Sequence, residues 1–125
     1  MNIMKNNYLF ILVFLFSKST FSEPAGIKHI VLCWLKNAEN PASLSAVIEA
    51  SKQLKSIPMV SDVVVGRALS SNRDIVDDSF DVGLVINFHN SHDLEQYLIH
   101  ADHVRRVKDV LAPQCQRLQV YDIAY

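Results

Sequence analysis

Four apolar segments of the chain have the pattern of β-strands, and two segments between them have the pattern of helices. Residues 27–35 are apolar at both odd and even positions, which predicts a strand that is covered on both faces. Residues 60–69 are centred on three consecutive valines, and residues 116–125 close the chain as a further strand. Residues 80–88 alternate between apolar and polar positions. The side chains predicted to share one face of this strand are Phe80, Val82, Leu84, Ile86 and Phe88.

The two helices are predicted from their caps and their apolar spacing. Asn40 is expected to cap the first helix, with Pro41 at the first helical position, and Pro58 to end it. The apolar stripe of this helix consists of Leu44, Val47, Ile48, Ser51 and Leu54. Ser91 is expected to cap the second helix, which runs towards Leu111.

The resulting order is β-α-β-β-α-β, the α+β arrangement called ferredoxin-like. It predicts a four-stranded antiparallel sheet with both helices on one face. The other face would carry Ile30, Leu32 and Trp34, and an uncovered apolar face of this size favours association. We therefore expect a homodimer in which a second sheet covers the first.

The amino terminus has the pattern of a secretory signal peptide. A short polar leader containing Lys5 precedes the unbroken apolar run of residues 8–16, which is shorter than the roughly 20 residues of a membrane span. Thr20 and Ser22 are small and suit cleavage before Glu23. The sequence therefore predicts a signal peptide at 1–22 and a mature domain at 23–125 without a membrane span, exported to the periplasm or secreted. An uncleaved anchor is the alternative.

Charge and composition limit the kinds of binding partner that the sequence predicts. The 125 residues are 50% hydrophobic and have a formal net charge of −1, and no segment is basic enough to predict a nucleic-acid partner. Export would allow Cys33 and Cys115 to form a disulfide. Two buried free thiols are the alternative, and the sequence leaves both open.

Three segments resemble the stress-responsive dimeric α/β-barrel domain family, of the olivetolic acid cyclase type. The resemblance covers residues 27–123. This sequence differs from the family pattern at Ala101, where the family usually has proline. The segments are Lys28-His29-Ile30-Val31, Tyr97-x-x-His100-x-x-His103-Val104 and Tyr121-Asp122.

This resemblance implies a homodimer built sheet to sheet, with a pocket between the sheet and helices of each monomer. It also implies that Tyr97 and His103 form an acid/base pair and that His29 lines the pocket. On an unbroken helix, residues six apart diverge by about 120°. Tyr97 and His103 can therefore face one cavity only if the helix bends near Ala101, and Asp102 is the expected N-cap of the restart.

The other residues expected to line the pocket are chosen by their positions along the predicted strands. We expect apolar walls that favour a small hydrophobic ligand, and we expect Asp122 to hold an imidazole in one tautomer. The wall residues are Val31, Phe80, Leu84, Phe88 and Leu118.

Several functions remain open at this point. The first hypothesis is cofactor-free acid/base catalysis, of cyclase or lyase type, on a small carbonyl compound. The alternatives are a non-catalytic small-molecule-binding protein of the envelope and a structural dimer. A haem- or oxygen-using monooxygenase of similar architecture is a further hypothesis. His100 and His103 could also bind a metal with His29 or Asp122, but the spacing is unspecific and no metal site is predicted.

Overall fold

The computed structural model describes residues 22–125. The predicted signal peptide, except for Ser22, lies outside the described residues. Four strands form one sheet: β1 (Ile27–Leu35), β2 (Asp62–Arg67), β3 (Val82–Phe88) and β4 (Cys115–Ala124). Their order in the sheet is β2-β3-β1-β4, and every neighbouring pair is antiparallel. The ferredoxin-like topology predicted from the sequence is therefore confirmed.

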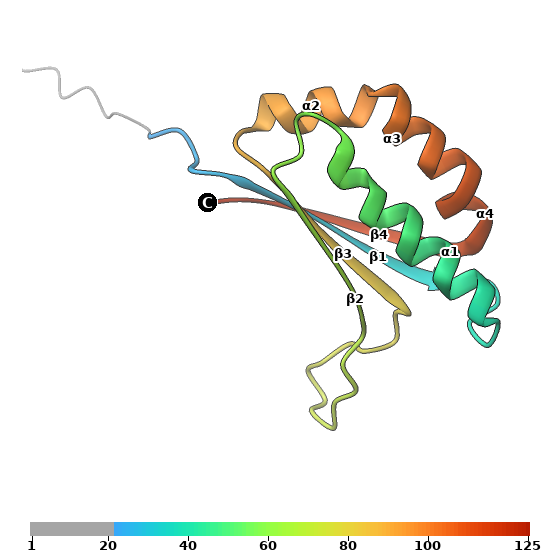
Figure 1. Ribbon diagram of the computed structural model, residues 1–125. Helices are drawn as coiled ribbons and strands as arrows, with labels where there is room; N and C mark the ends of the chain where they lie inside the picture. Colours follow the sequence, from blue (N-terminus) through green and yellow to red (C-terminus); the bar gives the residue numbers. More distant parts are fainter. Residues whose placement is uncertain (1–21) are drawn as a thin grey trace, which may run out of the picture.

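The helices cover one face of this sheet (Figure 1). The first connection contains α1 (Pro41–Lys52), which continues as the 3-10 turn η1 (Gln53–Ser56). The connection between β3 and β4 is made of four consecutive segments. They are α2 (Ser91–Ile99), α3 (Ala101–Arg106), the π-helical turn η2 (Val107–Leu111) and α4 (Ala112–Gln114). Among residues 22–125, no helix is both long enough and apolar enough to cross a membrane.

The cap of the first helix is confirmed, and that of the second is corrected. The side chain of Asn40 accepts a hydrogen bond from the backbone N–H of Ala42 at 3.0 Å, directly before Pro41. In the second helix the cap is Asn90, whose side chain accepts from the N–H of Asp93 at 2.8 Å. Ser91 is already the first helical residue, because the extended backbone of Asn90 turns its carboxamide back towards the first turn.

The core lies between the sheet and the helices, and it contains the alternate residues of β1 and β3. In β1 the buried set is Ile27, His29, Val31, Cys33 and Leu35, and in β3 it is Val82, Leu84, Ile86 and Phe88. Because β1 pairs with both β3 and β4, the helix-facing residues of three strands lie side by side. This arrangement places residues that are far apart in the sequence around one space.

Phe80 does not belong to this set, so its predicted position on the pocket wall is wrong. β3 begins only at Val82, because Asp81 leaves the strand pattern. The N–H of Asp81 donates to the carbonyl of Cys33, and its carboxylate accepts from the N–H of Leu35. Phe80 instead packs edge-on against Trp34, with ring centroids 6.4 Å apart, and lies beside Gly83 on the other face.

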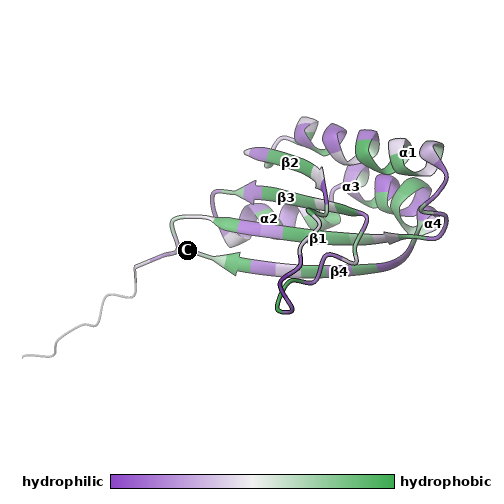
Figure 2. Ribbon diagram, turned by 90° about the horizontal axis from the view of Figure 1, so that it is seen from below, coloured by the Kyte–Doolittle hydropathy of each residue, from purple (hydrophilic) through white to green (hydrophobic). Residues whose placement is uncertain are grey.

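Figure 2 shows both apolar and polar segments along the strands. The sheet face without helices carries the apolar residues predicted for it, together with the polar residues Lys28, Asn87 and Arg117. The partly buried residues of β1 that alternate with the core, namely Ile30, Leu32 and Trp34, point to this side. In the register, Ile30 lies opposite Tyr121 of β4 and Val85 of β3. The exposed hydrophobic residues Val64, Tyr121 and Ile123 extend the same surface across β2 and β4.

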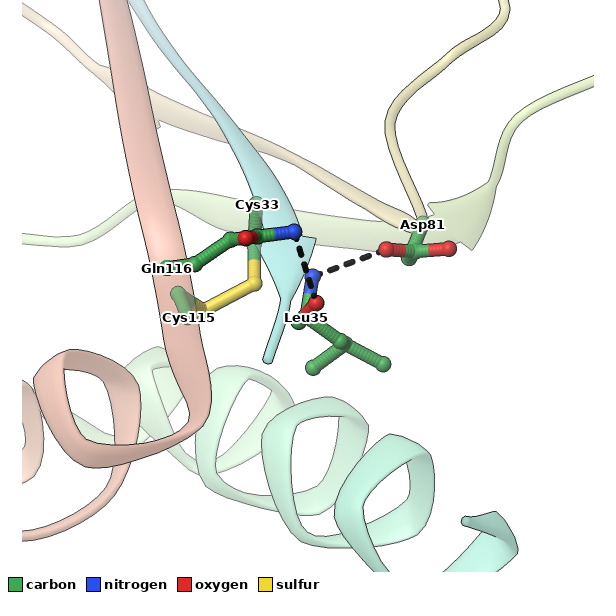
Figure 3. Close-up of a disulfide and its surroundings, with 5 residues drawn as sticks. All are labelled: Cys33, Leu35, Asp81, Cys115 and Gln116. Carbon is green, nitrogen blue, oxygen red and sulfur yellow. Dashed lines mark hydrogen bonds between the residues drawn. A yellow bond between two sulfur atoms is a disulfide. The ribbon is translucent and has the colours of Figure 1, made fainter. Parts of the chain in front are cut away.

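Cys33 and Cys115 form a disulfide that joins β1 to the start of β4 (Figure 3). Their Cα atoms are 5.6 Å apart, and both residues are buried. Beside the bridge, Leu35 donates its N–H to Asp81, and its carbonyl accepts from the side chain of Gln116. The sequence left the redox state of these cysteines open. The fold places the two thiols within bonding distance.

Candidate functional site

The break between α2 and α3 lies at His100. Its backbone is extended, with ψ at 135°, and α3 restarts at Ala101. The Nδ1 atom of His100 accepts a hydrogen bond from the N–H of Asp102 at 3.2 Å. The predicted bend is therefore present, but His100 caps the new helix and Asp102 does not. Asp102 is the second residue of α3, too late to act as its cap.

This bend brings Tyr97 and His103 together. Their ring centroids are 4.2 Å apart, although the residues belong to different helices. Tyr97 is almost completely buried, and its ring also lies 5.0 Å from that of Phe88. The expectation that the phenol and the imidazole converge is confirmed.

Both rings line a cavity between the sheet and the helices, with a volume of about 210 Å³. Six predicted site residues contribute to its wall: His29, Val31, Leu84, Tyr97, His103 and Leu118. Phe88 lies behind the ring of Tyr97, and Asp122 lies behind His29. Phe80 lies on the opposite face of the sheet.

Sequence reasoning missed the other half of the wall. The additional lining residues are Leu54, Ile86, Leu98, Val107, Leu111 and Val120. Ile86 and Val120 share their alternation with the predicted wall residues, so strand periodicity could have identified them. Leu98 and Val107 could not be found in this way, because the bend and the π-helical turn change which helix positions face the sheet.

His29 is held by Asp122 across the β1–β4 ladder. The two residues are register partners, and Nδ1 of His29 lies 2.6 Å from Oδ1 of Asp122. The side chain of His29 is only 6% exposed, whereas that of Asp122 is 48% exposed. Because a carboxylate can only accept, Nδ1 carries the proton in neutral His29, and Nε2 keeps its lone pair. The carboxylate thus fixes one tautomer of His29, whereas the predicted base His103 is oriented by a backbone carbonyl.

His103 has a matching arrangement with a neutral partner. Its Nδ1 donates to the backbone carbonyl of Leu98 at 3.1 Å, which again leaves Nε2 as the acceptor. Burial lowers the pKa of His103 below its ordinary value near 6.5, although the hydrogen bond to Leu98 opposes this shift. The neighbouring imidazoles of His29 and His100 lower the pKa further. His103 is therefore a neutral base at pH 7.

The pKa of Tyr97 is shifted in the opposite direction from that of His103. Burial raises the pKa of its phenol, so the hydroxyl keeps its proton at any physiological pH. The site thus combines one hydroxyl donor with two imidazole acceptors in apolar surroundings. Such a set can polarise a carbonyl and transfer a proton.

No metal centre forms among the described residues. No group of three or more histidine, cysteine, aspartate or glutamate side chains lies in ligating geometry within residues 22–125. The Nδ1 atoms of His100 and His103 are both engaged with backbone groups. The structure therefore does not bring together the metal ligands considered above.

Comparison with known proteins identifies the family. The profile of the stress responsive A/B barrel domain, Dabb, matches residues 27–124. The chain therefore belongs to the Dabb family. A search of curated proteins finds no match.

Solved structures with the same fold come from bacteria and plants. A Dabb family protein from Mesorhizobium loti is 25% identical, with a TM-score of 0.66 over 78% of this chain and 94% of that one. A dimeric ferredoxin-like protein of unknown function from Thermobifida fusca is 21% identical, with a TM-score of 0.66 over 85% and 96%. A hydroxynitrile lyase from Passiflora edulis is 19% identical, with a TM-score of 0.70 over 82% and 94%.

Proposed function

We propose that this protein is an exported Dabb homodimer whose pocket performs cofactor-free acid/base catalysis, of lyase or cyclase type, on a small carbonyl compound. The observation that carries this proposal is the convergence of Tyr97, His103 and His29 on one apolar cavity. The solved hydroxynitrile lyase supports it, because a fold of this kind hosts lyase chemistry in that protein.

In the proposed mechanism, Tyr97 and His103 divide the chemistry. The Tyr97 hydroxyl donates a hydrogen bond to the substrate carbonyl and stabilises the negative charge that develops on its oxygen. Nε2 of His103 removes the proton from the adjacent carbon and later returns it. His29, fixed by Asp122, binds the substrate from the sheet side. The nine aliphatic residues of the wall exclude water and strengthen each of these interactions.

The test is a survey of aldol, retro-aldol and cyanohydrin-cleaving reactions with small aromatic and aliphatic carbonyl compounds. For any activity found, Tyr97→Phe and His103→Gln should each lower kcat by about 10²- to 10⁴-fold. His92→Gln is the matched control, because His92 is exposed at the start of α2 and should leave kcat unchanged. Catalysis by this pair is refuted if both pocket variants retain full turnover.

The apolar wall also supports a second candidate, a protein that holds a small hydrophobic molecule without converting it. Native mass spectrometry of gently purified protein separates the two candidates. A co-purified apolar ligand that is released unchanged, together with no turnover in the survey, supports the binding protein. A substrate that is consumed supports the enzyme.

Export to the periplasm or the medium is supported by the disulfide, because bridges of this kind persist in oxidising compartments. The proposal predicts that the mature protein begins at Glu23. Intact-mass measurement after expression in a secreting host checks it. An intact amino terminus together with free thiols would contradict export with cleavage.

The homodimer is supported by the apolar outer face of the sheet and by the dimeric protein of the same fold from Thermobifida fusca. Tyr121→Asp places a charge on the edge strand β4 of that face, opposite Ile30 of the central strand β1. Light scattering should show a dimer for the native protein and a monomer for this variant. Glu49→Gln, on the exposed side of α1, is the control that should remain dimeric.

A further inference from the structure

The polar groups of the cavity define what a ligand must offer. Of the twelve lining residues, only His29, Tyr97 and His103 have polar side-chain atoms, and the others are aliphatic. No lysine or arginine is among them, so the wall has no permanent positive charge to pair with a bound anion. Placing a carboxylate or phosphate in such surroundings without a partner is costly.

The two imidazoles are both acceptors towards the cavity. His29 donates its Nδ1 proton to Asp122, and His103 donates its Nδ1 proton to the carbonyl of Leu98. In each neutral ring the lone pair on Nε2 remains for a ligand. A ligand that carries only a carbonyl would leave both lone pairs without a donor, and buried polar groups left unpaired weaken binding.

Tyr97 supplies the complementary donor. Its side chain lines the same wall as the two imidazoles, and the Tyr97 ring centroid lies 4.2 Å from that of His103 and 6.0 Å from that of His29. The matching ligand therefore accepts one hydrogen bond and donates at least one, with both groups close together.

The volume limits the size of this ligand. An apolar cavity of about 150 Å³ holds one benzene molecule. At about 210 Å³, this cavity suits a benzene-sized body with a short polar substituent.

We infer that the pocket selects neutral hydroxy-carbonyl compounds of this size, with the carbonyl on Tyr97 and the hydroxyl on Nε2 of His103 or His29. This inference rests on the proposed function and narrows the class of substrate that its pocket would accept. Because it concerns ligand binding and not reaction, it can be tested by affinity measurements without turnover.

Four phenyl ketones of similar size form the test panel: α-hydroxyacetophenone, α-methoxyacetophenone, acetophenone and benzoylformate. Titration with each, followed by heteronuclear NMR of the disulfide-bonded protein at pH 7.5, gives the affinities. The hydroxy ketone should bind about tenfold more tightly than acetophenone or its methoxy analogue, the loss expected for an unpaired polar group. Benzoylformate should show no saturable binding. Equal affinity for the first three ketones, preference for benzoylformate, or binding of none overturns the inference.

His103→Leu is the matched variant, because it removes one acceptor and keeps an aliphatic wall. If the hydroxyl binds His103, this variant should reduce the preference for α-hydroxyacetophenone over acetophenone to less than threefold; if it binds His29, His29→Leu should do so instead. In either variant acetophenone should still bind, which shows that the pocket is folded. An unchanged tenfold preference in this variant and in His29→Leu would overturn the assignment of the hydroxyl to the imidazoles. If the hydroxy ketone is preferred but no reaction is found, the proposed catalysis fails and the binding inference stands.

Discussion

Asp122 on β4 and His29 on β1 are cross-strand partners that join through Oδ1 and Nδ1 at 2.6 Å on the helix-covered face of the sheet. They are separated by 93 residues in the chain, and only the antiparallel ladder brings them together. The carboxylate is half exposed and the imidazole is buried, so the pair connects the solvent edge of β4 to the wall of the cavity.

This pairing predicts the tautomer of His29. In the native protein, ¹⁵N shifts from long-range heteronuclear correlation should show a protonated Nδ1 and a free Nε2. Asp122→Leu removes the acceptor and should shift the ring towards the Nε2–H form, which is common in unconstrained histidine. Asp122→Asn retains a carbonyl acceptor and should preserve the native tautomer. The same spectrum for native protein and the leucine variant would contradict the pairing.

The depressed pKa of His103 predicts how stability depends on pH. The pKa of His103 is near 6.5 in the unfolded chain and lower in the folded protein. Between these two pKa values the unfolded chain therefore binds more protons than the folded protein. The contribution of His103 is complete above about pH 6.5 and is lost as pH falls through its lower folded value. Denaturant midpoints measured between pH 8 and pH 4.5 should therefore decrease less steeply for His103→Gln than for the native protein. His92→Gln, at an exposed position, should follow the native curve.

Ala101 is a position where proline should stabilise the protein. It is the first residue of α3, and His100 before it has φ and ψ of −66° and 135°, which suit a residue that precedes proline. Ala101→Pro should raise stability by about 0.5–1 kcal/mol by restricting the unfolded chain. This corresponds to an increase in Tm of about 2–8 °C, measurable by calorimetry.

Gln96→Pro is the opposing control, because residue 96 lies inside α2 and proline there costs about 3 kcal/mol. A lower Tm for Ala101→Pro would show that the break at His100 needs a backbone N–H at residue 101.

The Cys33–Cys115 bridge should make a large contribution to stability. It closes a loop with a sequence separation of 82 residues and pins the start of β4, the strand that carries Asp122. The double variant Cys33→Ala/Cys115→Ala should lose about 2–5 kcal/mol of unfolding free energy. Urea titration measures this loss, and reduction of the native protein should give a comparable one. Identical midpoints with and without reductant would show that the thiols are not bridged.

Much of the fold could be predicted because its signals are local. Asn40-Pro41 starts a helix through its own side chain and ring, and alternation in residues 82–88 defines the buried face of β3. Phe80 was misplaced because a period of two cannot show where the strand begins. That boundary is set by the hydrogen bonds of Asp81 to β1, which join distant parts of the chain.

In the candidate site, too, local geometry could be predicted from the sequence, and contacts that depend on side-chain orientation could not. The six-residue separation of Tyr97 and His103 required a bend, which could be stated from helix geometry alone. The residue that makes the bend was not predicted, because an imidazole can cap a helix only when its lone pair faces the next turn.

Taken by itself, the sequence determined the order of elements, the shared face of the alternating residues in β3 and the need for a break between Tyr97 and His103. These follow from the spacing of neighbouring residues, which covalent geometry controls. The tertiary structure decided that Asp122 pairs with His29, that Cys33 meets Cys115 and that Phe80 packs with Trp34 on the outer face. Each of these depends on strand register and on where a strand begins, and those are set by hydrogen bonds between segments that the chain order leaves far apart.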